Sequence, residues 1–198
     1  VYEAGMTGKT ELTLETLAGI KNLKLWLNDK NKVEKVTVDM GEPILDSESI
    51  PTTFKCSPVV RQQLQIDKHI TYEVTCVSMG NPHTVIFMNE IDNLEITKVG
   101  SQIENSAYFP NRTNTEFIEI ISDNYLKMRV WERGSGETLA CGTGACASVV
   151  AAVLNSLLNR KAVVQLLGGE LEIEWRESDN HVYLTGDAVT VFEGEISL

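Results

Sequence analysis

The sequence of 198 residues is 42% hydrophobic and 23% charged, and its 17 basic and 28 acidic side chains give a net charge of −11. This composition is typical of a folded globular protein, and the acidity argues against nucleic acid or an anionic membrane as the main partner. No apolar run approaches the roughly 20 residues of a membrane span, and we expect a cytoplasmic protein.

The chain begins with Val1–Gly5, which resembles the last turn of a helix closed by a C-cap glycine. Strands follow, because apolar and polar side chains alternate with period two along most of the chain. Turn residues such as those at 28–31 and 168–169 separate several strands, which predicts mainly antiparallel pairing. The predicted strands are 10–16, 20–27, 33–40, 72–78, 84–88, 116–121, 125–132, 162–167, 170–176, 181–185 and 188–192.

Two segments break the alternation. Residues 93–105 carry apolar side chains at helical spacing, and residues 143–159 are small or apolar almost all round. A helix without a polar face is buried on all sides, so the sequence predicts an α+β fold in which a mostly antiparallel sheet wraps around a central helix. A loop-rich stretch suggests two units: residues 1–42 with a C-terminal strand at about 187–198, and residues 43–186.

The four cysteines and three histidines form neither a disulfide pattern nor a metal-binding pattern. No C-x-x-C pair occurs, and at this length the core does not need disulfides. No glycine-rich phosphate loop opens a helix after a strand, so we expect neither a metal nor another cofactor. The residues are Cys56, Cys76, Cys141, Cys146, His69, His83 and His181.

The most informative segment is ERGSGETLACGTG at residues 132–144, which brings Cys141 to the first turn of the predicted central helix. Amide groups at a helix start favour a thiolate and can hold an anion beside it. Most free cysteines simply pack, but Gly142 and Gly144 lower the helix propensity and let another molecule approach the backbone. The segment therefore indicates a functional site.

Two further polar segments adjoin predicted strands. GNPH at residues 80–83 forms a turn that projects Asn81 and His83, and RTNTEF at residues 112–117 leads into a strand. Taken alone, each is typical of an ordinary solvated turn.

Together and in this order, the three segments closely resemble those of diaminopimelate epimerases, and the resemblance extends over essentially the whole chain. This family contains cofactor-independent amino-acid epimerases of the lysine and peptidoglycan route, which act as homodimers. The resemblance implies two pseudosymmetric halves, each a sheet around a helix, of which the first is incomplete here. It also implies that a cysteine thiolate removes the α-proton of LL-2,6-diaminoheptanedioate while a second thiol returns a proton to the opposite face, giving the meso form.

By this resemblance, Cys141 is one of the two acid/base cysteines. His83 would tune the formation of its thiolate, and Glu132 would share that role. These three residues are the expected catalytic set.

The resemblance also assigns the substrate contacts. Gly142 and Thr143 would hold the α-carboxylate with amides at the helix start. Arg133 would pair with the distal carboxylate and Glu132 with an ammonium group. The remaining contacts, neutral donors at the distal end, would be Asn81 and Asn114.

The family's other cysteine lies in a Cys-Gly-Asn-Gly segment, which this sequence does not contain. Cys56 precedes a Ser-Pro pair and Cys76 lies in a predicted strand, so neither substitutes for it. We therefore expect the C-terminal portion of an epimerase, active in a longer or reassembled protein. The alternatives are an inactive fragment that binds dicarboxylic amino acids, a phenazine-biosynthesis or proline-racemase type isomerase, and a cysteine hydrolase with His83 as base.

Overall fold

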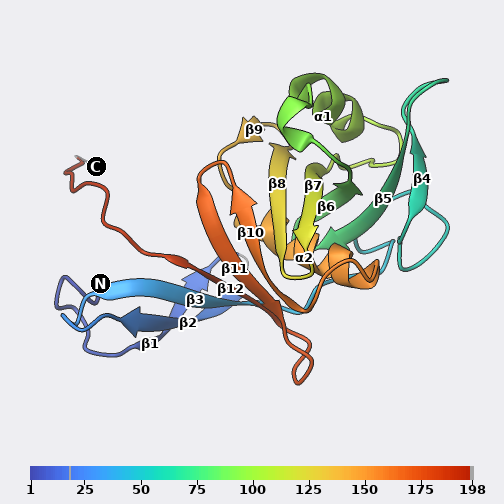
Figure 1. Cartoon of the computed structure of the whole chain (residues 1–198). Helices are drawn as coiled ribbons and strands as arrows, with labels where there is room; N and C mark the ends of the chain where they lie inside the picture. The colour runs from blue at the N-terminus through green and yellow to red at the C-terminus, as the bar shows by residue number, and fades with distance from the viewer. Residues whose placement is uncertain (18, 197–198) are drawn as a thin grey trace.

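The computed structural model describes residues 1–17 and 19–196, and residues 18 and 197–198 lie outside the described part. Twelve strands of the described residues join into one sheet (Figure 1). Helices α1 (Ile96–Glu104) and α2 (Gly142–Leu154) and a 3-10 turn, η1 (Ile91–Asn93), complete the α+β fold. The strands are β1 Glu11–Thr16, β2 Gly19–Leu27, β3 Val33–Gly41, β4 Gln62–Gln65, β5 Thr71–Ser78, β6 Pro82–Phe87, β7 Asn114–Ser122, β8 Tyr125–Glu132, β9 Gly136–Thr138, β10 Lys161–Leu166, β11 Gly169–Trp175 and β12 Val182–Asp187.

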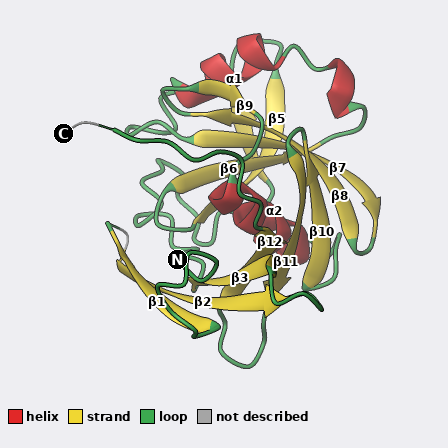
Figure 2. Cartoon of the chain, turned by 90° about the vertical axis from the view of Figure 1, so that its left-hand side faces the viewer, coloured by secondary structure: helices red, strands yellow, loops and turns green. Residues whose placement is uncertain are grey.

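Helix α2 lies at the centre, with the sheet wrapped around it (Figure 2). Nine of its 13 residues are buried, because alanine, valine, glycine and cysteine occupy every face and leave no continuous polar surface. The predicted central helix is confirmed, although it ends at Leu154, where Asn155 bonds back to the Ala151 carbonyl. The residues packed with it include Val85 of β6, Ile118 of β7, Val130 of β8 and Val164 of β10.

The sheet is antiparallel except at two places, where β6 pairs with β7 and β8 pairs with β10 in parallel. A parallel pair needs a crossover connection. The segment with η1 and α1 connects β6 to β7, and the segment with α2 connects β8 to β10 by way of β9. The predicted helix at residues 93–105 is thus confirmed as α1, and both helices occupy crossovers.

Strands β1, β2 and β3 form one end of the sheet and join the rest through the pairing of β3 with β12 (Figure 1). Among the described residues of these three strands, Leu25 is the one buried hydrophobic side chain. This end therefore has little core of its own. The division of the chain between residues 42 and 43 stays a prediction.

The turn at the start of the chain has the geometry of a helix C-terminus. Gly5 has a φ of +71°, and its amide donates to the Tyr2 carbonyl while the Met6 amide donates to the Val1 carbonyl. These two bonds are those of a Schellman motif. The predicted C-cap role of Gly5 is confirmed.

The strand predicted at residues 188–192, and with it the C-terminal strand at about 187–198, is wrong for the described residues. The chain leaves the sheet after Asp187, and the side chains of Val189, Val191 and Phe192 are 77%, 87% and 83% exposed. The physical reason is the length of the neighbouring strand. Asp187 lies opposite Lys35, and β3 begins at Val33, so almost no partner backbone remains.

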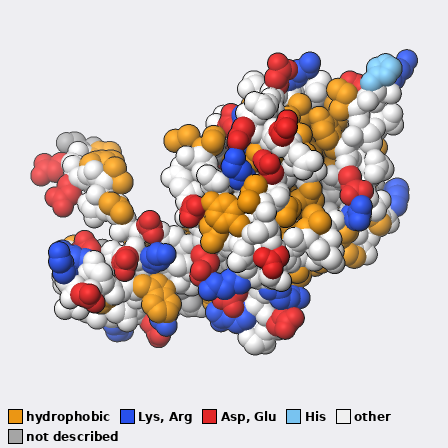
Figure 3. All heavy atoms as spheres, in the orientation of Figure 1, with side chains coloured by type: hydrophobic (Ala, Val, Ile, Leu, Met, Phe, Trp, Pro, Cys, Tyr) orange, Lys and Arg blue, Asp and Glu red, His pale blue; other side chains and the backbone are white. Residues whose placement is uncertain are grey.

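Strands β4 and β9 are missing from the predictions, because four and three residues give too few positions for alternation to be recognised. On the face shown in Figure 3, acidic and basic side chains are interspersed rather than gathered by sign. No helix in the described part of the chain is long and apolar enough to span a membrane.

Replacing Gly100 by alanine should destabilise the fold by about 1–3 kcal/mol, because overpacking a close contact costs that much. A Cβ atom at Gly100 would lie 2.4 Å from Trp131 Cγ, which packs against α1. The free energy of unfolding in urea measures the effect. Gly8→Ala is the matched control, since nothing lies within 4 Å of its added methyl group; equal stability of the two variants would contradict the prediction.

Candidate active site

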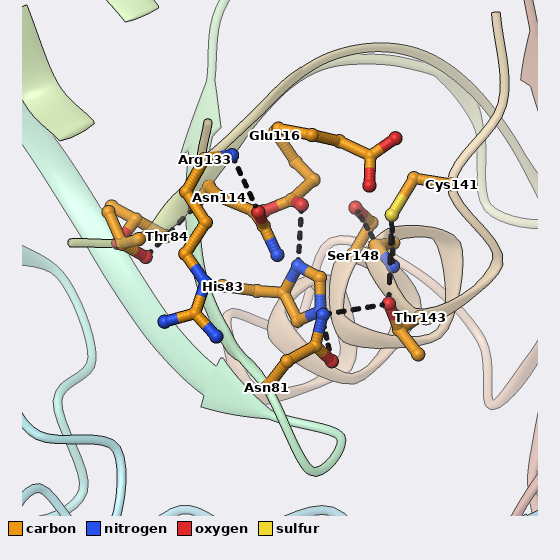
Figure 4. Close-up of polar contacts among 12 residues, drawn as sticks. Asn81, His83, Thr84, Asn114, Glu116, Arg133, Cys141, Thr143 and Ser148 are labelled. Carbon is orange, nitrogen blue, oxygen red and sulfur yellow. Dashed lines mark hydrogen bonds and ion pairs between the residues drawn. The ribbon is translucent and has the colours of Figure 1, made fainter. Parts of the chain in front are cut away.

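Segments far apart in the sequence meet at the N-terminus of α2 (Figure 4). The parallel register places His83 of β6 opposite Asn114 of β7, and β7 pairs with β8, whose last residue is Glu132. The chain then returns through β9 to Cys141. Hydrogen bonds, charge interactions or chain neighbours link the predicted site residues here: Asn81, His83, Asn114, Glu132, Arg133, Cys141, Gly142 and Thr143.

Cys141 is the N-cap residue of α2. Its backbone is extended, and its Sγ accepts a hydrogen bond from the Gly144 amide at 3.4 Å and lies 3.6 Å from Thr143 Oγ1. Glycine is required at position 144, because a Cβ atom there would lie 2.8 Å from Glu116 Oε1 and 3.2 Å from the Cys141 sulfur. Its missing side chain lets the sulfur and a carboxylate both approach the helix start.

The pKa of the Cys141 thiol is raised to about 12, first by burial and then by the negative charges of Glu116 and Glu132. Hydrogen bonds from Thr143 and Gly144 act in the opposite direction, because they stabilise the thiolate. Burial has a larger effect on this pKa than the two hydrogen bonds, because Cys141 is only 6% exposed. At neutral pH the residue is therefore a thiol that can donate a proton.

His83 is fully buried and held on both sides of its ring. Its Nδ1 lies 2.6 Å from Glu116 Oε1, and its Nε2 lies 3.1 Å from Asn81 Oδ1. Asn81 Nδ2 in turn donates to Thr143 Oγ1 at 3.3 Å. His83 thus reaches Cys141 through two other side chains and does not contact the sulfur itself.

Glu116 also belongs to the site, because its carboxylate contacts His83 and acts on the Cys141 thiol, although its role is not predicted from the sequence. It is fully buried on β7, two residues after Asn114, so both side chains lie on the same face of the strand. Its Oε2 has no hydrogen-bond partner among the described residues. The sequence holds one indication of this role. Glu116 lies two positions after Asn114 in a strand, which places an acidic side chain beside a predicted site residue.

Asn114 connects β7 to the segment after β8, because its Oδ1 accepts the Arg133 amide at 2.9 Å. The exposed Arg133 donates from Nη1 to the Asn111 carbonyl at 3.0 Å. Glu132 Oε1 accepts the Thr138 hydroxyl at 2.5 Å. A carboxylate and a guanidinium group therefore stand next to each other in the chain at the edge of the site.

Glu104, at the end of α1, holds this segment in place and is also missing from the sequence-based predictions. Its carboxylate accepts the Gly134 amide at 2.9 Å, Trp131 Nε1 at 2.7 Å and Arg112 Nη1 at 3.0 Å. Glu104 is 5% exposed, and a buried carboxylate is tolerated only with such donors. It fixes the loop after β8 relative to the turn before β7.

The other three cysteines do not oppose the Cys141 sulfur. Cys76 and Cys146 are buried in the core, where no substrate can reach them, and the half-buried Cys56 packs against a different core cluster. All four are free thiols in the described part of the chain. The described residues therefore offer Cys141 no second thiol across a substrate.

A family model described as diaminopimelate epimerase matches residues 75–191, a range that contains every residue of this site. The sequence is 52% identical to the diaminopimelate epimerase of Methanococcus maripaludis (strain C6) and 54% identical to that of Acetivibrio thermocellus. Both alignments cover 100% of this chain, and they cover 71% and 70% of the two relatives. The chain belongs to the diaminopimelate epimerase family. Because the members of this family are amino-acid epimerases, so is this protein.

Solved structures outside the diaminopimelate epimerases share the fold. A probable proline racemase from Agrobacterium radiobacter K84 superposes with a TM-score of 0.70 at 16% identity, covering 99% of this chain and 64% of that protein. A PhzF-family phenazine biosynthesis protein from Bacillus anthracis gives 0.61 at 15% identity, with 99% and 72% covered. At such low identity the likeness concerns the fold alone, and it confirms the predicted fold class.

Alkylation of Cys141 by iodoacetamide should be very slow near neutral pH and rise about tenfold per pH unit to at least about pH 11. The reason is that the thiolate is the nucleophile, and a thiol pKa raised to about 12 keeps it scarce at lower pH. Mass spectrometry of the labelled peptides measures the rate, with the half-buried Cys56 reporting reagent activity at each pH. A rate that levels off below about pH 9 would contradict the burial argument.

Glu104→Gln should lower the free energy of unfolding by about 1–3 kcal/mol, because one donor of the cluster loses its charged acceptor. Urea denaturation followed by circular dichroism measures it. Glu95→Gln, an exposed position just before α1 whose side chain forms no capping bond, is the matched control. If both variants are equally stable, Glu104 does not anchor the loop.

Proposed function

We propose that this chain carries one of the two cysteines of an epimerase that converts LL-2,6-diaminoheptanedioate to the meso form in lysine and peptidoglycan biosynthesis. The observation that carries the proposal is the capping of α2 by Cys141, whose sulfur accepts the Gly144 amide at 3.4 Å at the mouth of the helix. Relatives at 52% and 54% identity are named diaminopimelate epimerases, which supports the same substrate for this chain.

Inversion at the α-carbon needs a base on one face and an acid on the other. The opposing thiolate takes the α-proton, and the electron pair spreads into the α-carboxylate. The Cys141 S–H bond then breaks as a new C–H bond forms on the other face, which leaves Cys141 as a thiolate. In the reverse direction this thiolate is the base. The raised pKa of the Cys141 thiol favours its protonated form, which would serve the LL-to-meso direction.

The α-carboxylate of the substrate would lie at the start of α2. The first amides of a helix have no acceptor within the helix, and those of Gly142 and Thr143 directly follow Cys141 in the chain. An anion at this end gains from the helix dipole. The same amides would stabilise the charge that moves onto the carboxylate when the α-proton leaves.

The charged pair at the end of β8 suits the distal end of a doubly zwitterionic substrate. Arg133 would pair with the distal carboxylate and Glu132 with an ammonium group. Asn114 Nδ2 supplies a neutral donor nearby, since Asn114 Oδ1 is held by the Arg133 amide. Asn81 Nδ2 already donates to Thr143 Oγ1, which leaves its second hydrogen for a substrate. An ammonium beside Glu132 would also offset one of the charges that raise the pKa of the Cys141 thiol.

The proposal needs a second thiol, which the described residues do not place opposite Cys141. We therefore propose that the complete site forms when this chain is assembled with a segment that carries that thiol. Association as a homodimer, without metal or other cofactor, stays a prediction drawn from the family.

A chimaera tests the proposal. This chain replaces the aligned 70% of the Acetivibrio thermocellus epimerase, and the product is incubated with the LL substrate in heavy water. The chimaera should form meso product with deuterium at the α-carbon. Cys141→Ala should lower kcat by roughly 100-fold or more, the usual effect of losing an acid/base group.

Cys56→Ala in the same chimaera is the matched control, because this thiol packs away from the site, and it should leave kcat unchanged. An active Cys141→Ala chimaera would rule out the assigned role. Formation of meso product by the isolated chain would rule out the need for a second thiol from elsewhere.

Ligand binding without turnover is the second candidate, favoured by the missing opposing thiol among the described residues. It predicts that diaminopimelate protects Cys141 of the isolated chain from alkylation while the α-proton does not exchange. Turnover by the chimaera, abolished by Cys141→Ala, decides for the epimerase.

A further inference from the structure

Glu132 is a carboxylate of the proposed site that has no cationic partner among the described residues. The other carboxylate near the Cys141 thiol, that of Glu116, contacts the His83 ring at 2.6 Å. The guanidinium group next to Glu132 in the chain, that of Arg133, donates to a backbone carbonyl instead. A carboxylate without a cation beside it can pair with a cationic group of a ligand.

A hydroxyl group holds this carboxylate. Thr138 Oγ1 donates to Glu132 Oε1 at 2.5 Å, the short distance that is typical of an O–H group bonded to a charged oxygen. Glu132 is half-buried, and its Oε2 makes no hydrogen bond within the described part of the chain. One oxygen of the carboxylate is therefore fixed, while the other remains available to a ligand.

The pairing of β8 with β9 brings the two side chains together (Figure 1). Thr138 lies opposite Val130, and Glu132 lies opposite Gly136. Thr138 and Glu132 are thus diagonal neighbours on one face of the sheet, within reach of a long side chain. Because Gly136 has no side chain, nothing on that residue blocks the Glu132 side chain from crossing β9 to the hydroxyl.

Strand β9 is held in place without the Thr138 hydroxyl. Its backbone pairs with β8, and on its other face Glu137 accepts Arg129 Nε at 2.8 Å. Directly after the strand, the Leu139 carbonyl accepts the Gly168 amide at 2.8 Å. The side-chain bond from Thr138 is therefore not needed to fix the strand, which indicates that it acts on the carboxylate.

We propose that Thr138 is a positioning residue, which holds the Glu132 carboxylate so that its Oε2 accepts an ammonium group of the substrate. The identity of the ligand rests on the proposed function, but the fixing of the carboxylate does not. Thr138 lies three positions before Cys141, so one short segment carries both the acid/base sulfur and the residue that orients its charged neighbour.

A purely structural bond is the competing account. In that account, loss of the Thr138 hydroxyl displaces the segment that leads to Cys141 and weakens the binding of every ligand. The positioning account predicts weaker binding only of ligands that carry an ammonium group. Heptanedioate separates the two accounts, because it has the two carboxylates of diaminopimelate on the same carbon chain but no ammonium group.

The activity test uses the chimaera with the Acetivibrio thermocellus epimerase. Thr138→Val should raise KM for the LL substrate about fivefold, the equivalent of one hydrogen bond, and should leave the inhibition constant of heptanedioate unchanged. Thr138→Ser keeps the hydroxyl and should restore KM. Thr115→Val is the matched control and should leave KM unchanged. The Thr115 hydroxyl is buried without a partner in the described structure, and its position opposite Trp131 places it on the other face of the sheet from Glu132.

The route is tested by adding Glu132→Ala, which removes the carboxylate. If Thr138 acts through Glu132, Thr138→Val has no further effect on KM in that background. An unchanged KM in Thr138→Val, an equal rise in the inhibition constant of heptanedioate, no rescue by Thr138→Ser, or full additivity with Glu132→Ala each overturns the proposal.

A measurement without substrate decides the case in which the chimaera has no activity. In the isotope-labelled chain, three-bond nuclear magnetic resonance couplings should show one fixed rotamer of Glu132, and averaging over several rotamers in Thr138→Val. Averaging in the unmodified chain, or a fixed rotamer in Thr138→Val, overturns the proposal. Because this measurement involves neither diaminopimelate nor turnover, its failure and that of the epimerase assay are distinguishable.

Discussion

Helix α2 has no polar face, so it must bury its whole length inside the sheet, and only its ends can take part in polar chemistry. The amides at its N-terminus need partners, and there the Cys141 sulfur accepts the Gly144 amide. The parallel pairing of β6 with β7 and the end of β8 bring the other polar groups to this point. The position of the site thus follows from the packing of one apolar helix.

The parts of this arrangement that the sequence predicts are local ones. The central helix and Cys141 at its start follow from a contiguous segment, and most strands follow from alternation. Glu116 and Glu104 escape prediction because their partners, His83 and Gly134, lie 33 and 30 positions away in the sequence. The strand predicted at residues 188–192 is absent for a related reason: alternation records which face is apolar, but not whether a neighbouring strand extends far enough to pair.

Several groups around the Cys141 sulfur act on the pKa of its thiol in opposite directions. Burial first, and then the charges of Glu116 and Glu132, raise the pKa of the Cys141 thiol, while the Thr143 hydroxyl and the Gly144 amide lower it. A site for a substrate with two carboxylates and two ammonium groups needs both signs, since each ionic group must find its opposite. Under the proposed function, a substrate that brings its own charges to the site would shift this balance at the sulfur.

The burial of Cys141 also protects the sulfur chemically. Oxidation to sulfenic acid starts from an exposed thiolate, so cysteines with low pKa at the surface are damaged first. Cys141 is 6% exposed and its thiol pKa is about 12, which leaves peroxides almost no reactive species to attack. The proposed acid/base role of Cys141 needs a reduced sulfur, and burial preserves the sulfur in that form.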